Sequence, residues 1–357
     1  MQTMTDLEKL CSRVTEAADC AVITDDVNRR YFTAMKSSAG TLVVFPEKAY
    51  FIIDFRYIEK AKKTVTACEV ILQDKLYEQI NSLIEKHGAK TVSVNADTCT
   101  ISELIAYQQK LNAEVIADTK LAEIIREIRT VKSQEQIDKI IKAQRIAEKG
   151  FAHMLDFIKV GRTEKEIQLE LDYYMLKNGA EALSFDTIAL SGSNTSLPHG
   201  VPSDKKVESG EFVLMDFGAT YDGWHSDMTR IVCVGKPSDK MKSVYETVLT
   251  AQLSALDAVK AGMSGKALDK IARDIITEAG YGDNFGHSLG HGVGVEIHES
   301  PYASPSREDI LPENSIVTVE PGIYLEGKFG VRIEDFVVVT ENGCINMTKA
   351  PKELICL

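Results

Sequence analysis

Apolar and polar positions along residues 1–118 predict strands and helices that follow one another. Two apolar runs, 41–46 and 49–54, flank a short polar turn, which is typical of two neighbouring strands. Segments 76–86 and 101–111 instead have apolar residues at helical spacing, and we expect amphipathic helices there. Residues 1–118 are therefore predicted to form an independent α/β domain.

The pattern continues without a glycine-rich or serine-rich linker. Residues 120–129 are charged and helical in pattern, and a second helix begins at Ser133, whose Ser-x-x-Gln spacing resembles a capping box. We therefore predict a linker helix over 119–132 and a second domain over 133–357.

The second domain contains an internal repeat. Helices with similar openings begin at Gly161 and Gly262, 101 positions apart, and a longer helix precedes each of them. The strands that follow also correspond, 212–218 with 316–322 and 227–232 with 334–339. Because helices precede a strand pair in each half, we predict a duplicated domain.

The strand pair of the first half contains two acids, Asp216 and Asp227, on either side of a turn at Asp222-Gly223. We predict that these acids lie directly opposite each other, in a register that leaves 220–223 as a four-residue loop. Like charges in such a position repel, and a cation between them would remove the repulsion. The alternative is that both acids face solvent on an exposed sheet.

The second half repeats this arrangement with Glu320 and Glu334, which can pair across a hairpin centred on Gly327. Beside them, the glycine-rich segment 285–301 contains three of the seven histidines. Four carboxylates and an imidazole suit two divalent ions such as Mn²⁺, Co²⁺, Fe²⁺ or Zn²⁺. Two ions ~3.5–4 Å apart can bridge a water, lower its pKa and polarise a carbonyl, so the implied reaction is hydrolysis.

Composition restricts the partners and the location. The chain of 357 residues has a formal net charge of −12, which opposes binding to nucleic acid or to an anionic membrane. Neither a signal segment nor an apolar run of about 18 residues is present, and we expect a cytoplasmic protein. The seven cysteines are scattered without Cys-x-x-Cys spacing, so we predict neither a disulfide framework nor a thiolate zinc site.

Several motifs together resemble the prolidase and aminopeptidase P branch of the pita-bread metallopeptidases. They are Asp216-Phe-Gly-Ala, Ser226-Asp-Met-Thr-Arg230, Gly290-His-Gly-Val-Gly with His298-Glu-Ser-Pro301, Val319-Glu-Pro-Gly322 and Gly330-Val-Arg-Ile-Glu-Asp335. The resemblance covers essentially the whole chain. It implies an α/β (α+β) architecture, with a creatinase-like N-terminal domain followed by a duplicated pita-bread catalytic domain.

The resemblance also implies roles for individual residues. Two metals would be ligated by five side chains, of which Asp227 and Glu334 are shared between the ions: Asp216, Asp227, His291, Glu320 and Glu334. Glu320 is in addition the family's candidate for proton transfer from the bridging water. His199, His287 and His298 would contact the substrate carbonyl or the tetrahedral intermediate, and Arg332 would lie behind the metals.

The implied activity is hydrolysis of Xaa-Pro bonds in short proline-containing peptides, by a dipeptidase or an aminopeptidase, with a metal-bridged hydroxide as nucleophile. Mn²⁺ or Co²⁺ is expected before Zn²⁺ or Fe²⁺, and the protein is expected to be a homodimer. Three alternatives stay open. A methionine aminopeptidase shares the five ligands but lacks the N-terminal domain, a creatinase shares both domains but not the ligands, and a non-catalytic peptide- or histone-binding module would have lost the acids.

Overall fold

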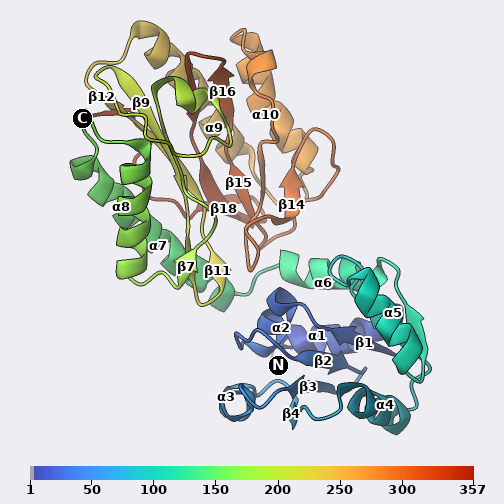
Figure 1. The fold of residues 1–357 in the computed structure, drawn as a ribbon. Helices are drawn as coiled ribbons and strands as arrows, with labels where there is room; N and C mark the ends of the chain where they lie inside the picture. The colour runs from blue at the N-terminus through green and yellow to red at the C-terminus, as the bar shows by residue number, and fades with distance from the viewer. Residues whose placement is uncertain (1–3) are drawn as a thin grey trace. The chain divides into compact units, whose positions relative to one another are not determined.

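The computed structural model describes residues 4–357, which form two compact units (Figure 1). The first ends at Arg129, and the second runs from Thr130 to Leu357. Among the described helices, none is both long and apolar enough to cross a membrane.

The first unit is a mixed six-stranded sheet with helices on both faces. The strand order is β4-β3-β2-β1-β5-β6, in which β2 runs antiparallel to both of its neighbours and the other neighbouring strands are parallel. The strands are β1 (Cys20–Ile23), β2 (Thr41–Val44), β3 (Ala49–Ile53), β4 (Glu69–Leu72), β5 (Thr91–Val94) and β6 (Glu114–Ile116). The predicted strands at 41–46 and 49–54 are thus confirmed.

Alternation along the strands builds one core on each face of this sheet. In β1, Ala21 and Ile23 enter a core with α1, α2, α3 and α6, whereas Cys20 and Val22 enter a core with α4 and α5. The helices are α1 (Asp6–Arg13), α2 (Asp26–Thr33), α3 (Ile58–Thr64), α4 (Leu76–His87), α5 (Ile101–Lys110) and α6 (Lys120–Thr130), with the 3₁₀ turn η1 (Val14–Glu16). The helices predicted at 76–86 and 101–111 are confirmed, and α6 packs Leu121 and Ile124 into the first unit's own core.

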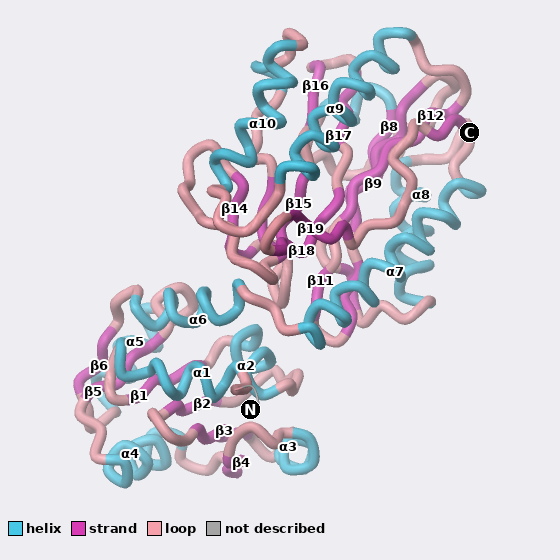
Figure 2. The backbone as a smooth tube through the Cα atoms, turned by 180° about the vertical axis from the view of Figure 1, so that it is seen from behind, coloured by secondary structure: helices cyan, strands magenta, loops and turns pink. Residues whose placement is uncertain are grey.

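The second unit places its strands between two pairs of helices (Figure 2). Helices α7 (Gln134–Phe157) and α8 (Glu164–Lys177) cover one face, and α9 (Asp239–Ala258) and α10 (Gly265–Glu278) cover the other. The capping box predicted at Ser133 is confirmed, because its side chain accepts from the Gln136 amide and the Gln136 side chain accepts from the Ser133 amide. Each shorter helix follows a longer one, as the repeat predicts.

The strands of this unit form several small sheets. Their orders are β20-β12-β9-β8, β15-β18-β19, β11-β10-β7, β13-β14 and β16-β17. The first half supplies β7 (Ala182–Leu183), β8 (Ile188–Ser191), β9 (Glu211–Phe217), β10 (Ala219–Tyr221), β11 (Trp224–His225) and β12 (Met228–Val234), with η2 (Gly192–Ser196). The second half supplies η3 (Gly282–Asn284), β13 (Gly290–Gly292), β14 (Glu299–Ala303), β15 (Ile316–Val319), β16 (Gly322–Leu325), β17 (Phe329–Arg332), β18 (Asp335–Thr340), β19 (Gly343–Asn346) and β20 (Ile355–Cys356).

The first hairpin differs from its predicted register by two residues. Asp216 in β9 lies opposite Thr229 in β12, not opposite Asp227, and only Asp222-Gly223 connects β10 to β11. The predicted four-residue loop was therefore wrong. Both turn residues have positive φ, 49° and 82°, which suits a two-residue turn whose twist matches that of the strands. A shift of two residues keeps both acids on one face of the hairpin.

The second hairpin has the predicted register. Val319 pairs with Asp335 and Gly322 pairs with Arg332, so Glu320 and Glu334 occupy corresponding positions between these two ladders. Gly327 lies in the connecting turn with a φ of 67°.

Candidate metal centre and active site

The acids and histidines selected from the sequence meet at one cavity in the second unit. Its volume is about 480 Å³. All nine predicted site residues line it: His199, Asp216, Asp227, His287, His291, His298, Glu320, Arg332 and Glu334. The prediction that both halves of the repeat face a shared centre therefore agrees with the positions of these side chains.

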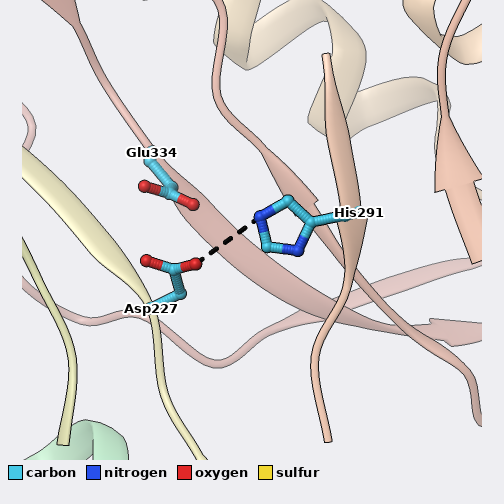
Figure 3. A group of neighbouring side chains, drawn as sticks. All are labelled: Asp227, His291 and Glu334. Carbon is cyan, nitrogen blue, oxygen red and sulfur yellow. Dashed lines mark ion pairs between the residues drawn. The ribbon is translucent and has the colours of Figure 1, made fainter. Parts of the chain in front are cut away.

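One group in this cavity that could hold a metal ion contains Asp227, His291 and Glu334. One possible ligand atom of each lies within 4.8 Å of the others, and the three side chains point toward one another (Figure 3). Asp227 precedes β12, His291 is the middle residue of β13, and Glu334 lies between β17 and β18. Asp216 at the end of β9 and Glu320 after β15 line the same cavity, and Glu320 Oε1 lies 3.3 Å from His291 Nε2.

The imidazole of His291 is oriented toward the acids by its own backbone. Its Nδ1 lies 3.1 Å from the carbonyl oxygen of Gly292, and its Nε2 lies 3.3 Å from Glu320 Oε1 and 3.6 Å from Asp227 Oδ2. In the tautomer that donates from Nδ1, the Nε2 lone pair faces the carboxylates. This is the orientation that metal-binding histidines adopt in proteins.

Two of the carboxylates have one oxygen held by the protein and one without a partner. Arg332 donates to Asp216 Oδ2 at 2.6 Å, and the Thr229 hydroxyl donates to Glu334 Oε2 at 2.7 Å. Asp216 Oδ1 and Glu334 Oε1 are buried and accept no hydrogen bond from any described residue. An unpaired buried carboxylate oxygen is costly, and a divalent cation is the ligand that these oxygens fit.

The charges of this cluster shift its pKa values in opposite directions. Burial, followed by the charge of a neighbouring acid, raises the pKa of Asp227 and of Glu334 well above the ordinary range. Burial also acts to raise the pKa of Glu320, but the hydrogen bond and charge of His291 outweigh it and lower that pKa to about 2. Burial acts to lower the pKa of His291, but Glu320 and Asp227 raise it to about 9. An excess of buried negative charge thus surrounds a single imidazole, as a cation site requires.

His287 is held by a chain of hydrogen bonds that ends at Arg332. Its Nε2 lies 2.9 Å from the Tyr324 hydroxyl, which in turn accepts from Arg332 at 2.8 Å. Arg332 also donates to the Thr229 hydroxyl and to the carbonyl oxygen of Pro198. The guanidinium therefore links His287, Asp216 and the loop that bears His199.

The remaining two histidines are more exposed. The ring of His298 packs edge-on against that of His291, with centroids 4.4 Å apart. Burial and the charge of His291 lower the pKa of His298, and burial lowers that of His287. His199 lines the cavity from the loop after η2, and its side chain makes no hydrogen bond with the described residues.

Helix α10 fixes the segment that contains His287. The buried carboxylate of Asp269 accepts from Arg273 and from the Leu289 amide. Arg273 donates in turn to the carbonyl oxygens of Phe285 and His287. One turn of the helix therefore anchors both ends of this short segment.

Sequence reasoning missed Tyr324 and the apolar part of the cavity wall. Tyr324 lies in strand β16, and the alternation of side chains along this strand identifies it only as a packing residue. The apolar wall comes from separate segments whose meeting no local pattern encodes: Phe185, Ile188, Pro198, Ile297 and Tyr302.

Comparison with protein families assigns both units. The profile of metallopeptidase family M24 matches residues 138–341, and that of the creatinase/prolidase N-terminal domain matches residues 7–131. The chain belongs to metallopeptidase family M24. The predicted order of a creatinase-like domain and a pita-bread catalytic domain is confirmed, and so is the prediction of a metallopeptidase.

Individual M24 relatives extend over nearly the whole chain. An Xaa-Pro dipeptidase of Pyrococcus furiosus is 39% identical over 352 residues, which cover 98% of this chain and 99% of that protein. A solved structure of an Xaa-Pro dipeptidase from Bacillus anthracis is 41% identical, with a TM-score of 0.95 and 99% of both chains covered. An X-Pro aminopeptidase from Thermotoga maritima is 38% identical, with a TM-score of 0.90 and coverage of 95% and 98%. The resemblance to the prolidase and aminopeptidase P branch is thus confirmed.

Proposed function

We propose that this protein is a dinuclear-metal-dependent exopeptidase that hydrolyses Xaa-Pro bonds in short peptides. The observation that carries the proposal is the convergence of four carboxylates and one imidazole on the cavity, with a buried, unpaired oxygen on both Asp216 and Glu334. The M24 relatives named above as Xaa-Pro dipeptidases or aminopeptidases supply the substrate class.

Five side chains would hold the ions: Asp216, Asp227, His291, Glu320 and Glu334. Two divalent ions bound there would supply Lewis acidity and an activated water. Mn²⁺ and Co²⁺ are the proposed ions, because the donor set contains four carboxylates and only one nitrogen.

The other residues would act on the substrate. With a pKa of about 2, Glu320 is ionised over the whole neutral range, and it would accept a proton from the attacking water. His298 has a lowered pKa, so its imidazole is uncharged at neutral pH and can donate an N–H to the carbonyl oxygen as negative charge develops on it. The pKa of His287 is also lowered, but the Ser288 carbonyl oxygen engages its Nδ1 and the Tyr324 hydroxyl engages its Nε2, so His287 would border the substrate without donating an N–H to it. His199 faces the same space, and Arg332 fixes the orientation of Asp216.

All three alternatives have specific evidence against them. The match to the creatinase/prolidase N-terminal domain disfavours a methionine aminopeptidase, which lacks that domain. Retention of all five proposed ligands disfavours a creatinase and a non-catalytic binding module.

The decisive experiment compares substrates on protein that has been stripped of metal and reloaded. We expect Mn²⁺ or Co²⁺ to restore cleavage of Ala-Pro or Ala-Pro-Ala, with little cleavage of Ala-Ala at the same concentration. Equal turnover of Ala-Ala, or full activity in the presence of a chelator, would refute the proposal. The ratio of dipeptide to tripeptide cleavage decides between a dipeptidase and an aminopeptidase.

Two further properties belong to the proposal. A homodimer follows from the family resemblance, and sedimentation of the intact protein tests it. A cytoplasmic location is consistent with the seven cysteines, all of which are free.

A further inference from the structure

A buried acid outside the proposed metal centre organises the loop that bears His199. Glu164 is the first residue of α8, and its side chain is completely buried. Its carboxylate accepts six hydrogen bonds, all from uncharged donors. They come from Ser191 N at 2.7 Å, Ser191 Oγ at 3.2 Å, Asn194 Nδ2 at 3.0 and 3.2 Å, Ser203 N at 3.0 Å and Ser203 Oγ at 2.6 Å.

These donors lie at the two ends of one loop. Oε1 holds Ser191, where β8 ends, and Oε2 holds Ser203 at the far end, while Asn194 contacts both oxygens. Between them the chain passes along the cavity, which Pro198 and His199 line. One carboxylate therefore closes the base of the loop 191–203.

The position of His199 depends on this loop more than on contacts of its own side chain. The imidazole makes no hydrogen bond with the residues that the structure describes, so its backbone determines where it points. Apart from Glu164, two contacts from β17 hold the loop, since the Gly330 amide donates to Thr195 Oγ1 and Arg332 donates to the Pro198 carbonyl oxygen.

The internal repeat allows the start of α8 to be compared with the start of α10, its equivalent in the second half. The first turn of α10 has no buried acid, so this local structure does not itself require one. The offset of 101 places Gly265 at the position equivalent to Glu164. The backbone contacts correspond, because Glu164 N donates to Lys205 O as Gly265 N donates to Asp309 O. A Cβ on Gly265 would lie 1.9 Å from the Tyr302 carbonyl oxygen, so main chain fills the space in the second half. A carboxylate occupies this position only in the half whose loop bears His199.

We propose that Glu164 is a positioning residue, which fixes the loop 191–203 so that His199 meets the substrate. This inference rests on the proposed function, in which His199 contacts the substrate. Glu164→Gln tests it, because the amide group cannot accept the hydrogen bonds that one carboxylate oxygen receives. We expect kcat/KM for Ala-Pro or Ala-Pro-Ala to fall ~10- to 100-fold, as for a catalytic group displaced by about 1 Å, with the bound metal content unchanged.

A double-mutant cycle separates this role from a general structural one. If Glu164 acts through His199, adding Glu164→Gln to His199→Ala should change kcat/KM by less than about threefold. The matched control is Glu166→Gln, which neutralises an exposed acid in the first turn of the same helix without touching the loop and should leave kcat/KM near that of the wild type. Additive losses in the cycle, or an unaffected Glu164→Gln enzyme, would overturn the inference.

A second measurement does not depend on activity. The measurement is an NMR spectrum of metal-free protein that carries ¹³C at the Cε1 atom of its histidines. The resonance of His199 is identified by its absence from the spectrum of His199→Ala. We expect Glu164→Gln to move or broaden that signal while the His153 signal stays in place, and an unchanged His199 signal would contradict the inference. If Glu164→Gln does not fold, Ser203→Ala removes one of the six hydrogen bonds and should give a smaller shift of the same signal. Failure of wild-type protein to cleave any Xaa-Pro peptide would refute the proposed function but leave this readout intact.

Discussion

At the scale of single residues, three of the five proposed ligands are held by one side-chain atom, which leaves another atom to face the cavity. Asp216 and Glu334 each have one oxygen fixed by Arg332 or Thr229 and the other free, and His291 has Nδ1 at a backbone carbonyl and Nε2 toward the acids. Ligands arranged in this way lose little conformational entropy when a cation binds, because their orientation is already fixed.

Removal of a shared ligand should lower both the bound metal content and the activity. In Asp227→Asn or Glu334→Gln a neutral amide replaces a carboxylate, and we expect the bound metal to fall below two per chain and kcat/KM to fall at least ~100-fold. Elemental analysis and peptide hydrolysis measure the two effects. Asp274→Asn, which changes an exposed acid of α10 paired with Lys270, is the matched control and should change neither. Two metals and full activity in either ligand variant would show that the assignment is wrong.

The histidines that are not proposed ligands should behave differently. We expect His199→Ala and His298→Ala to lower kcat by ~100-fold or more, because each removes a hydrogen-bond donor or proton-transfer group near the reacting carbonyl. Metal content should stay near two per chain in both variants, whereas His291→Ala should lose metal. If His199→Ala or His298→Ala lost metal as completely as His291→Ala, those residues would be ligands.

At the scale of elements, the sequence predicted what depends on local pattern and missed what depends on long-range contact. Helices α4, α5 and α7 and the hairpin centred on Gly327 follow from periodicity, capping and turn residues. The first hairpin was placed two residues out of register, because an Asp-Gly turn fits both a two-residue and a four-residue loop when only the sequence is known.

Side-chain contacts across the fold were beyond such patterns. The hydrogen bond between Tyr324 and His287 joins residues 37 positions apart, and those between Glu164 and Ser203 join residues 39 apart. In the sequence, Tyr324 has no local feature that distinguishes it from a packing tyrosine. Glu164 likewise looks like any acid in the first turn of a helix. The spacing of the acids and the three clustered histidines, by contrast, selected residues that line one cavity, and the family resemblance added His199 and Arg332.

The segment that bears His298 has an anchor of its own, which predicts a stability effect. Lys132 Nζ donates to Glu299 Oε1 at 2.7 Å, and both side chains are almost completely buried. Lys132→Met would leave the Glu299 carboxylate without this cation, and we expect the free energy of unfolding to fall by about 3–5 kcal/mol. Urea unfolding measures the change. The control Lys266→Met breaks the exposed pair with Glu308 and should cost less than about 1 kcal/mol. Equal losses in the two variants would contradict the prediction.

At the scale of the whole molecule, the proposed metal centre joins the two halves of a duplicated unit. Asp216 and Asp227 come from the first half, and His291, Glu320 and Glu334 from the second. All five lie in the unit that begins at Thr130, so the first unit contributes no proposed ligand. Binding of metal should therefore stabilise the contact between the halves, and its removal should expose the repulsion among the acids.

This repulsion predicts how the stability of metal-free protein depends on pH. The pKa of His291 rises from 6.5 to about 9 on folding, so its contribution is fully present below pH 6.5 and is lost as the pH rises through 9. Asp227 and Glu334 act in the same direction, because their raised pKa values favour the protonated forms in the folded state. Glu320 does not titrate in this range, since its pKa is about 2.

We therefore expect the free energy of unfolding of chelator-treated protein to fall by on the order of 3 kcal/mol between pH 6.5 and 9. The free energy of unfolding of manganese-loaded protein should fall by less over the same pH range, because a rising pH deprotonates the ligands and strengthens metal binding. Urea unfolding at the two pH values gives the comparison, and hydrogen exchange should place the loosening within residues 130–357. His291→Ala should flatten the decline in metal-free protein, since it removes the imidazole whose proton is lost. A metal-free protein equally stable at both pH values would show that the acids and His291 are not coupled through charge.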